Sequence, residues 1–134
     1  MDLGLAGKNV IVTAGSGGLG YHIARAYASE GASVTVSARN PDRLEAAVAK
    51  IRTETGGSIT AVVADMTDAD AIGVMIDQVE ERQGGIDVLV SNSGGANTAP
   101  FIDMTDDLWR DGAKVLADVL TKLGNDTDTN TQEV

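Results

Sequence analysis

The sequence has 134 residues, 43% of them hydrophobic, no cysteine and a formal net charge of -10, which fits one domain whose core needs no disulfide or metal to hold it together. The absence of cysteine excludes thiol catalysis and cysteine-based zinc sites, and a single histidine, His22, argues against a histidine-rich metal site. The acidic excess disfavours binding to nucleic acids or anionic membranes, so an anionic ligand has to be held by a local site.

Short runs rich in Val and Ile alternate with longer segments in which apolar residues recur at helical spacing, which is typical of βαβ units. Each run is almost continuously apolar, as expected of a parallel strand that is buried on both faces of its sheet. The predicted strands are residues 9–14, 33–38, 58–64 and 86–90.

Three helices are predicted between these strands. Gly31 stops the first; the second begins at Pro41, with Asn40 as its N-cap, and ends at Gly56. The third covers about residues 67–82. Their apolar faces consist of Leu19, Ile23, Ala26 and Tyr27 in the first helix, Leu44, Ala47, Val48 and Ile51 in the second, and Ile72, Met75, Ile76 and Val79 in the third.

The last part of the chain is predicted to be less regular. A loop follows Gly94 up to Asp103, and Thr105 with the two aspartates after it predicts the start of a final helix. The residues from Asn125 onward have almost no apolar content, which predicts a disordered tail. We therefore expect one domain over residues 1–124.

A glycine-rich segment follows the first strand directly. Residues 15–20 (GSGGLG) satisfy G-x-G-x-x-G between a predicted strand and a predicted helix, the context that a dinucleotide site requires. The glycines allow a tight turn and a close approach to a pyrophosphate, whose charge meets the free N–H groups of the helix that follows. A glycine-rich turn without a ligand remains the alternative.

Four segments together resemble the short-chain dehydrogenase/reductase family. Residues 13–20 are similar to its T-G-x-x-x-G-x-G segment, with Ala14 in place of the first glycine. Residues 37–40, 65–67 and 91–94 look like its cofactor-contact segments after the second, third and fourth strands, the last being similar to the family's N-N-A-G motif.

The resemblance covers residues 3 to about 110. We expect a Rossmann-like three-layer α/β sandwich whose parallel four-stranded sheet has the order 3-2-1-4, with a nicotinamide dinucleotide at the carboxyl ends of the strands. The resemblance implies that Asp65 meets the adenine amino group, that the Met66 amide contacts the ring, and that Asn92 supports the fourth strand; Asp65 as a helix-capping acid is the alternative. The candidate cofactor-binding residues are Thr13, Gly15, Ser16, Gly17, Gly18, Leu19, Gly20, Arg39, Asn40, Asp65, Met66, Asn92, Ser93 and Gly94.

The residues after the second strand favour NADP(H) over NAD(H). Sites for NAD place an acid here to bind the ribose 2′-hydroxyl, whereas sites for NADP use arginine. This chain has Arg39 and no acid before Asp42, and a guanidinium pairs well with a 2′-phosphate. The alternative is that Arg39 is a solvated loop residue.

The family's catalytic serine and Tyr-x-x-x-Lys are not found in the sequence. Its two tyrosines, Tyr21 and Tyr27, lie on the first predicted helix, and the Arg25 that follows Tyr21 at this spacing is interpreted as a coincidence. The resemblance stops near Arg110, before an asparagine that the family has where Leu116 stands. We expect a truncated, catalytically incompetent NADP(H)-binding portion of an oxidoreductase, with a dinucleotide-sensing or interaction module and a gene remnant as alternatives.

Other expectations concern partners and location. The fourth strand would leave a sheet edge that drives formation of a homo-oligomer or lowers solubility. No apolar run reaches the roughly 20 residues of a membrane span and the start lacks the features of a signal peptide, so we expect a cytoplasmic protein that binds neither membrane nor nucleic acid. The acidic excess fits a high-salt cytoplasm or an ordinary acidic protein.

Overall fold

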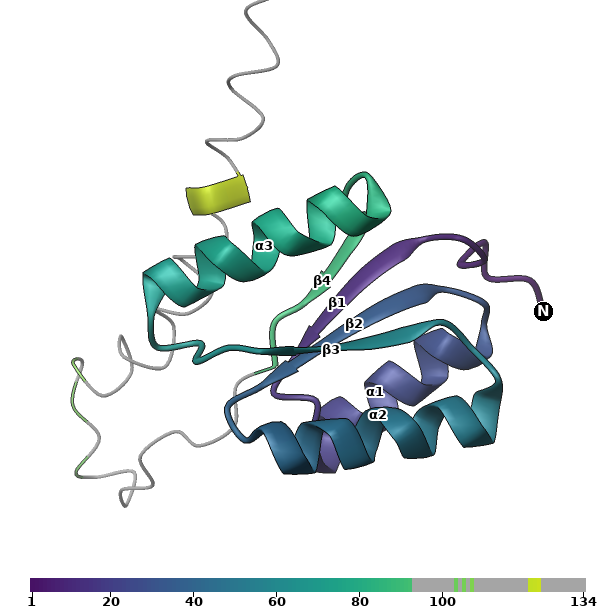
Figure 1. Cartoon of the computed structure of the whole chain (residues 1–134), viewed down its shortest axis with the longest axis horizontal. Coiled ribbons are helices and arrows are strands. Elements are labelled where there is room, and N and C mark those ends of the chain that lie inside the picture. Colours follow the sequence, from purple (N-terminus) through teal and green to yellow (C-terminus); the bar gives the residue numbers. More distant parts are fainter. Residues whose placement is uncertain (93–102, 104, 106, 108–120, 124–134) are drawn as a thin grey trace, which may run out of the picture.

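The computed structural model describes residues 1–92, 103, 105, 107 and 121–123 of the chain. Its strands are parallel and form one four-stranded sheet in the order β3-β2-β1-β4 (Figure 1). The strands are β1 (Asn9–Thr13), β2 (Ser33–Ala38), β3 (Ile59–Val63) and β4 (Val88–Val90). The predicted parallel sheet and its strand order are confirmed.

Helices cover both faces of this sheet. On one face lie α1 (Gly18–Ser29) and α2 (Pro41–Thr55), and on the other lies α3 (Ala69–Gln83) (Figure 1). Val10 and Val12 of β1 belong to the core cluster on the side of α1 and α2, whereas Ile11 belongs to the cluster on the side of α3. Because β1 is buried on both faces, its run of residues is apolar throughout. The predicted three-layer sandwich is confirmed.

The face of α1 that packs on the sheet differs from the predicted one. Its buried residues are Gly20, Ala24 and Ala28. Leu19 is 69% exposed, Ala26 is also exposed, and Ile23 and Tyr27 pack only at the margin of the core. The prediction was wrong for Leu19 and Ala26 because α1 approaches the sheet too closely for large side chains, and hydrophobic periodicity favours large ones.

The two other helices have the buried faces that the sequence predicts. Asn40 caps α2 by accepting a hydrogen bond from the Arg43 N–H at 2.9 Å, and Gly56 ends it in the left-handed conformation. α3 begins at Ala69, two residues later than predicted, because Asp68 is its N-cap and accepts a hydrogen bond from the Asp70 N–H at 2.9 Å.

Three strands are shorter than predicted, since β1 ends at Thr13 instead of residue 14. β3 covers Ile59–Val63, and β4 begins at Val88 instead of residue 86. The chain ahead of β4 is still leaving the turn at Gly84 and Gly85, whose φ angles are 79° and 150°. Within the part of the chain that the structure describes, β4 pairs only with β1.

Several predictions lie outside the described residues: the site residues Ser93 and Gly94, the loop before Asp103, most of the final helix, and the tail from Asn125. Residues 121–123 are helical, and Leu123 packs against the core cluster on the α3 side. Lys122 Nζ lies 3.2 Å from Asp77 Oδ1 of α3. None of the described helices is long and apolar enough to cross a membrane.

Candidate functional site

The loop between β1 and α1 lies directly on its neighbours. The Gly15 N–H donates to the Ser37 carbonyl oxygen of β2 at 3.1 Å, and a Cβ on Gly15 would lie 2.3 Å from Val36 Cγ1. A Cβ on Gly20 would lie 2.5 Å from the Ala14 carbonyl oxygen and 2.7 Å from Asn92 Nδ2. Side chains at these two positions would push the loop away from the sheet, so the glycines fix its path.

The N-terminus of α1 has no side chain to satisfy its N–H groups. Gly17 is the N-cap, no side-chain hydrogen bond caps the helix, and no acidic residue lies in its first turn. Gly18 is the first helical residue and has a φ of 53°, and Leu19 beside it is exposed. Free N–H groups at the positive end of a helix form a site suited to an anion.

Thr13 and Asn92 join the ends of β1 and β4. The Thr13 hydroxyl donates to the Asn92 carbonyl oxygen at 2.7 Å and accepts from the Asn92 N–H at 2.9 Å. Asn92 Nδ2 lies 3.4 Å from the carbonyl oxygens of both Thr13 and Ala14. Thr13 is only 1% exposed. These contacts give Thr13 and Asn92 a supporting place beneath the glycine loop.

Ala14 has an unusual backbone conformation. Its φ is 51°, the one positive value at a non-glycine position in the described chain. This is the position at which the sequence departs from the glycine of the T-G-x-x-x-G-x-G pattern. The left-handed conformation costs a residue with a Cβ about 1 to 2 kcal/mol, so the loop carries backbone strain that glycine would relieve.

The end of β3 holds a structured carboxylate. Asp65 Oδ1 accepts hydrogen bonds from the Thr67 N–H at 2.9 Å and the Thr67 hydroxyl at 2.7 Å. These bonds, with a smaller contribution from the charge of Arg39, hold the pKa of Asp65 below its ordinary value. Asp65 is not the N-cap of α3, because Asp68 has that role. Asp65 is therefore ionised and oriented at the carboxyl edge of the sheet.

Two other predicted site residues have structural contacts of their own. Met66 is buried at 9% exposure, and its side chain packs in the core cluster on the α3 side with its sulfur 3.9 Å from the Ser37 hydroxyl oxygen. Asn40 uses its Oδ1 to cap α2. Arg39, which follows β2, is exposed and takes part in none of the ion pairs among the described residues.

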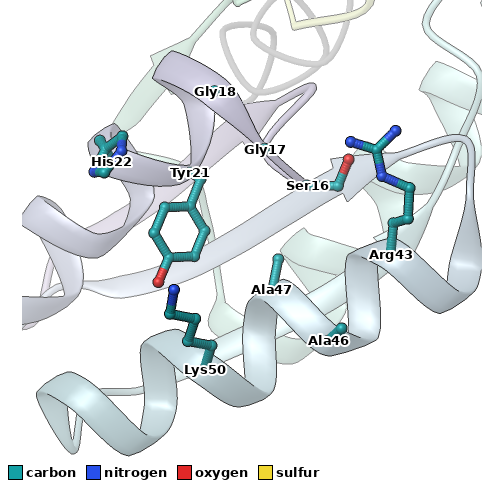
Figure 2. A pocket seen from close by; sticks show the side chains of 9 residues that line it. All are labelled: Ser16, Gly17, Gly18, Tyr21, His22, Arg43, Ala46, Ala47 and Lys50. Atoms are coloured by element: carbon teal, nitrogen blue, oxygen red, sulfur yellow. The ribbon is translucent and has the colours of Figure 1, made fainter.

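A groove of about 460 Å³ lies between α1 and α2, beside the glycine loop (Figure 2). Two of its side chains, Arg43 and Lys50, are cationic, and none is acidic. It is lined by Ser16, Gly17, Gly18, Tyr21, His22, Arg43, Ala46, Ala47 and Lys50. The sequence predicted Ser16, Gly17 and Gly18 as site residues but missed Arg43. The sequence feature that could have indicated Arg43 is its position in the first turn of α2, four residues after Arg39.

Tyr21 belongs to a surface cluster that joins α1 to α2. Its hydroxyl lies 3.4 Å from Glu54 Oε2, which also accepts from Arg25 Nε at 2.6 Å. Lys50 Nζ lies 5.4 Å from the centre of the Tyr21 ring. The spacing of Tyr21 and Arg25 is thus explained by a shared carboxylate partner. Within the described residues no group of His, Asp or Glu could hold a metal ion.

A family model described as short chain dehydrogenase matches residues 8–117. The chain belongs to this family. A short chain dehydrogenase/reductase of Colletotrichum higginsianum, dpchG, is 42% identical over 107 residues, which are 79% of this chain and 40% of that protein. A reductase of Mycobacterium tuberculosis that acts on a hexahydroindene carboxyl-CoA is 40% identical over 106 residues, 78% of this chain and 40% of that protein.

Solved structures of short-chain dehydrogenases have the same fold. L-Sorbose reductase of Gluconobacter frateurii, complexed with NADPH and L-sorbose, matches with a TM-score of 0.79 at 29% identity, over 93% of this chain and 48% of that chain. A metagenomic short-chain oxidoreductase in complex with NADP matches with a TM-score of 0.74 at 32% identity, over 88% of this chain and 55% of that chain. The chain thus spans about half the length of these structures.

This short-chain dehydrogenase chain brings its described candidate residues together at one edge of the sheet. The loop after β1, Arg39 after β2, Asp65 after β3 and Asn92 after β4 all follow the carboxyl ends of parallel strands. The strand order reverses between β1 and β4. The connecting helices α1 and α2 cover one face of the sheet, and α3, which leads to β4, covers the other (Figure 1). Ligands of open α/β sheets bind at such a switch point.

Proposed function

We propose that this chain is the NADP(H)-binding portion of a short-chain oxidoreductase. The observation that carries the proposal is the uncapped N-terminus of α1, which a glycine loop holds against β2 and Asn92. A dinucleotide pyrophosphate fits this arrangement, because it needs N–H donors and a backbone that it can approach closely. In the family's reaction this cofactor would supply a hydride to a carbonyl or accept one from an alcohol.

The remaining residues at this edge suit the other parts of the cofactor. The Asp65 carboxylate is ionised and oriented, so it can accept a hydrogen bond from an adenine amino group. Arg39 stands where an NAD site would have an acid, and the first carboxylate after β2 is that of Asp42. Two structural neighbours whose names include NADPH or NADP support the same preference.

We propose further that these 134 residues bind NADP(H) without turnover. Proton transfer in the family's reaction requires an acid with a tuned pKa next to the substrate oxygen. Tyr21 and Tyr27 are the tyrosines of the sequence, and neither is followed by lysine at the fourth position. The Tyr21 hydroxyl lies 3.4 Å from Glu54 Oε2 of α2, and Lys50 lies over the Tyr21 ring, so its contacts are with the surface between α1 and α2.

A titration of the 134-residue chain with NADPH and NADH tests the binding proposal. Isothermal calorimetry gives the two dissociation constants, and a thermal melt at 100 times the dissociation constant should show about 2.7 kcal/mol of added stability. We expect tighter binding of NADPH. No response to either dinucleotide would reject the proposed function, and tighter binding of NADH would reject the preference.

A carbonyl-reduction assay with the same protein tests the proposal on turnover. Hydride transfer is followed as loss of NADPH absorbance in the presence of a panel of ketones and aldehydes. We expect no rate above that of NADPH alone. A robust rate that is abolished when the site is disrupted by Gly20→Val would show that another residue supplies the proton.

We also propose that the outer edge of β4 is a site of self-association. Among the described residues its backbone pairs only with β1, and an open strand edge is a template for another strand. Size-exclusion chromatography with light scattering should detect a dimer or a larger species. A monomer at all concentrations would contradict this.

A further inference from the structure

The geometry points to a second cation that the glycine loop and α2 hold in place. Arg43 lies in the first turn of α2, where its N–H donates to Asn40 Oδ1 at 2.9 Å. Its guanidinium Nη2 lies 3.4 Å from the point that a Cβ on Gly17 would occupy. Because Gly17 has no side chain, the guanidinium can reach the outer side of the loop. Figure 2 shows Arg43 at the end of the groove where Ser16 also lies.

The cations near the groove differ in whether they form an ion pair with a described carboxylate. Arg25 and Lys50 both pair with Glu54, at 2.6 and 4.0 Å, on the surface between α1 and α2. Arg39 forms no ion pair with the described residues, and its charge makes only the smallest contribution to lowering the pKa of Asp65. Arg43 takes part in none of the ion pairs that involve the described residues. Its positive charge is therefore fully available to a ligand.

We propose that Arg43 determines specificity by binding the ribose 2′-phosphate of NADP(H), a role that rests on the proposed function. A 2′-phosphate is a dianion or nearly so near neutral pH and binds best when more than one cation contacts it. Arg39 supplies one cation, and a second guanidinium adds further charge-assisted hydrogen bonds to the phosphate. Arg43 approaches from the loop side and Ser16 adds a hydroxyl donor, so the phosphate is held between α2 and the loop.

This role makes a prediction that separates the two dinucleotides. Arg43 contacts only the phosphate by which NADPH differs from NADH, and a charge-assisted hydrogen bond to phosphate is strong and directional. We expect Arg43→Ala to weaken NADPH binding about tenfold or more and to leave NADH binding within about a factor of two. Arg43→Lys should restore part of the affinity, since it keeps the charge without the planar fork.

Lys50→Ala is the matched control. Lys50 lies on the same helix and lines the same groove, so the variant has the same change in net charge. Its partners are Glu54 and the ring of Tyr21. We expect its affinities for NADPH and NADH to stay at the wild-type values. A fall in NADPH affinity equal to that of Arg43→Ala would mean that NADPH responds only to the total positive charge of the groove, and would overturn the proposal.

The experiment is a calorimetric titration of the full chain and each variant with NADPH, NADH, adenosine 2′,5′-bisphosphate and 5′-AMP. Circular dichroism confirms that each variant is folded, and Arg43→Gln replaces Arg43→Ala if the latter is not. Equal effects on the 2′-phosphorylated and unphosphorylated ligands, or no effect on either, would refute the role of Arg43 while leaving dinucleotide binding intact. If the wild-type chain binds none of the ligands, the proposed function fails and this inference fails with it.

Discussion

The three described helices begin at the same edge of the sheet, but their N-termini are built in two different ways. α2 and α3 have side-chain caps, Asn40 and Asp68, and each has an acid in its first turn. α1 has a glycine as its N-cap and no acid in its first turn. Caps and acids satisfy the free N–H groups and the positive end of a helix. Two helices thus have side-chain acceptors at their N-termini, and α1 has none.

Among the variants that test the difference between the α1 N-terminus and those of α2 and α3, Gly20→Val should have the largest effect. The added side chain would begin 2.5 Å from the Ala14 carbonyl oxygen and 2.7 Å from Asn92 Nδ2, so α1 has to move away from the sheet. We expect a loss of about 1 to 3 kcal/mol in the free energy of unfolding, with loss of NADPH binding. Urea denaturation and calorimetry measure the two effects.

Gly73→Ala in α3 is the control for that variant. The nearest atom to a Cβ on Gly73 is Lys122 Cε, at 4.0 Å, so alanine fits. We expect Gly73→Ala to raise stability by about 0.5 to 1 kcal/mol, because alanine is the better helix former. If Gly20→Val is as stable as the wild type, the close approach of α1 to the loop does not exist.

Gly17→Asp would give α1 the kind of N-terminus that α2 and α3 have. The carboxylate can cap the helix and approach Arg43, so we expect stability to rise by about 0.5 kcal/mol. Affinity for NADPH should fall more than about tenfold, because the added charge repels the pyrophosphate. The mirror variant Asp68→Ala should lose about 1 kcal/mol and keep its affinity. Undiminished binding by Gly17→Asp would show that the α1 N-terminus is not the anion site.

Ala14→Gly should have a smaller effect, in the stabilising direction. It removes the cost of the left-handed conformation at a φ of 51°, offset in part by the greater freedom of glycine in the unfolded chain. We expect a net gain of about 0.5 kcal/mol in a denaturation experiment. The control is Ala46→Gly on the exposed side of α2, which should lose about 1 kcal/mol. A loss for both variants would contradict the strain at Ala14.

The smallest effect concerns Asp65. Its pKa lies below the ordinary value of 3.8 because Thr67 donates two hydrogen bonds to it. Since the folded state has the lower pKa, the stabilisation is present above pH 3.8 and is lost as the pH falls through the folded-state value. Thr67→Val removes one donor and should raise the pKa of Asp65 toward 3.8, as measured by NMR titration of the carboxyl carbon.

Thr53→Val tests whether that change is specific. The Thr53 hydroxyl donates to the Ala49 carbonyl oxygen in α2 and has no contact with Asp65. We expect the pKa of Asp65 in this variant to equal that of the wild type. A pKa unaltered by Thr67→Val would mean that the hydroxyl does not contribute.

Much of the fold followed from local patterns, and the errors have a common cause. The buried faces of α2 and α3 were predicted residue by residue, because large apolar side chains at helical spacing decide them. The buried face of α1 was not predicted. It consists of Gly20, Ala24 and Ala28, which are small because the helix lies close to its neighbours and not because they are strongly hydrophobic. The same closeness explains why Leu19 is exposed.

The candidate site shows the same limit. The sequence predicts that the glycine loop, Arg39 and Asp65 lie at one edge of the sheet, since they follow parallel strands, and the structure has them there. Arg43 was not among the predicted site residues, because its place beside Gly17 depends on packing between segments that are distant in sequence. The hydrogen bonds between Thr13 and Asn92 likewise join residues 79 positions apart.

The sequence by itself determined the elements, because apolar periodicity and capping residues are local signals, and its four motifs carried the family resemblance that implied the strand order. Only the tertiary structure decided which small residues of α1 meet the sheet, that Ala14 adopts a φ of 51°, and that the Arg43 guanidinium lies beside Gly17 of the loop. These features depend on distances between segments that the chain brings together when it folds, and no local pattern contains those distances.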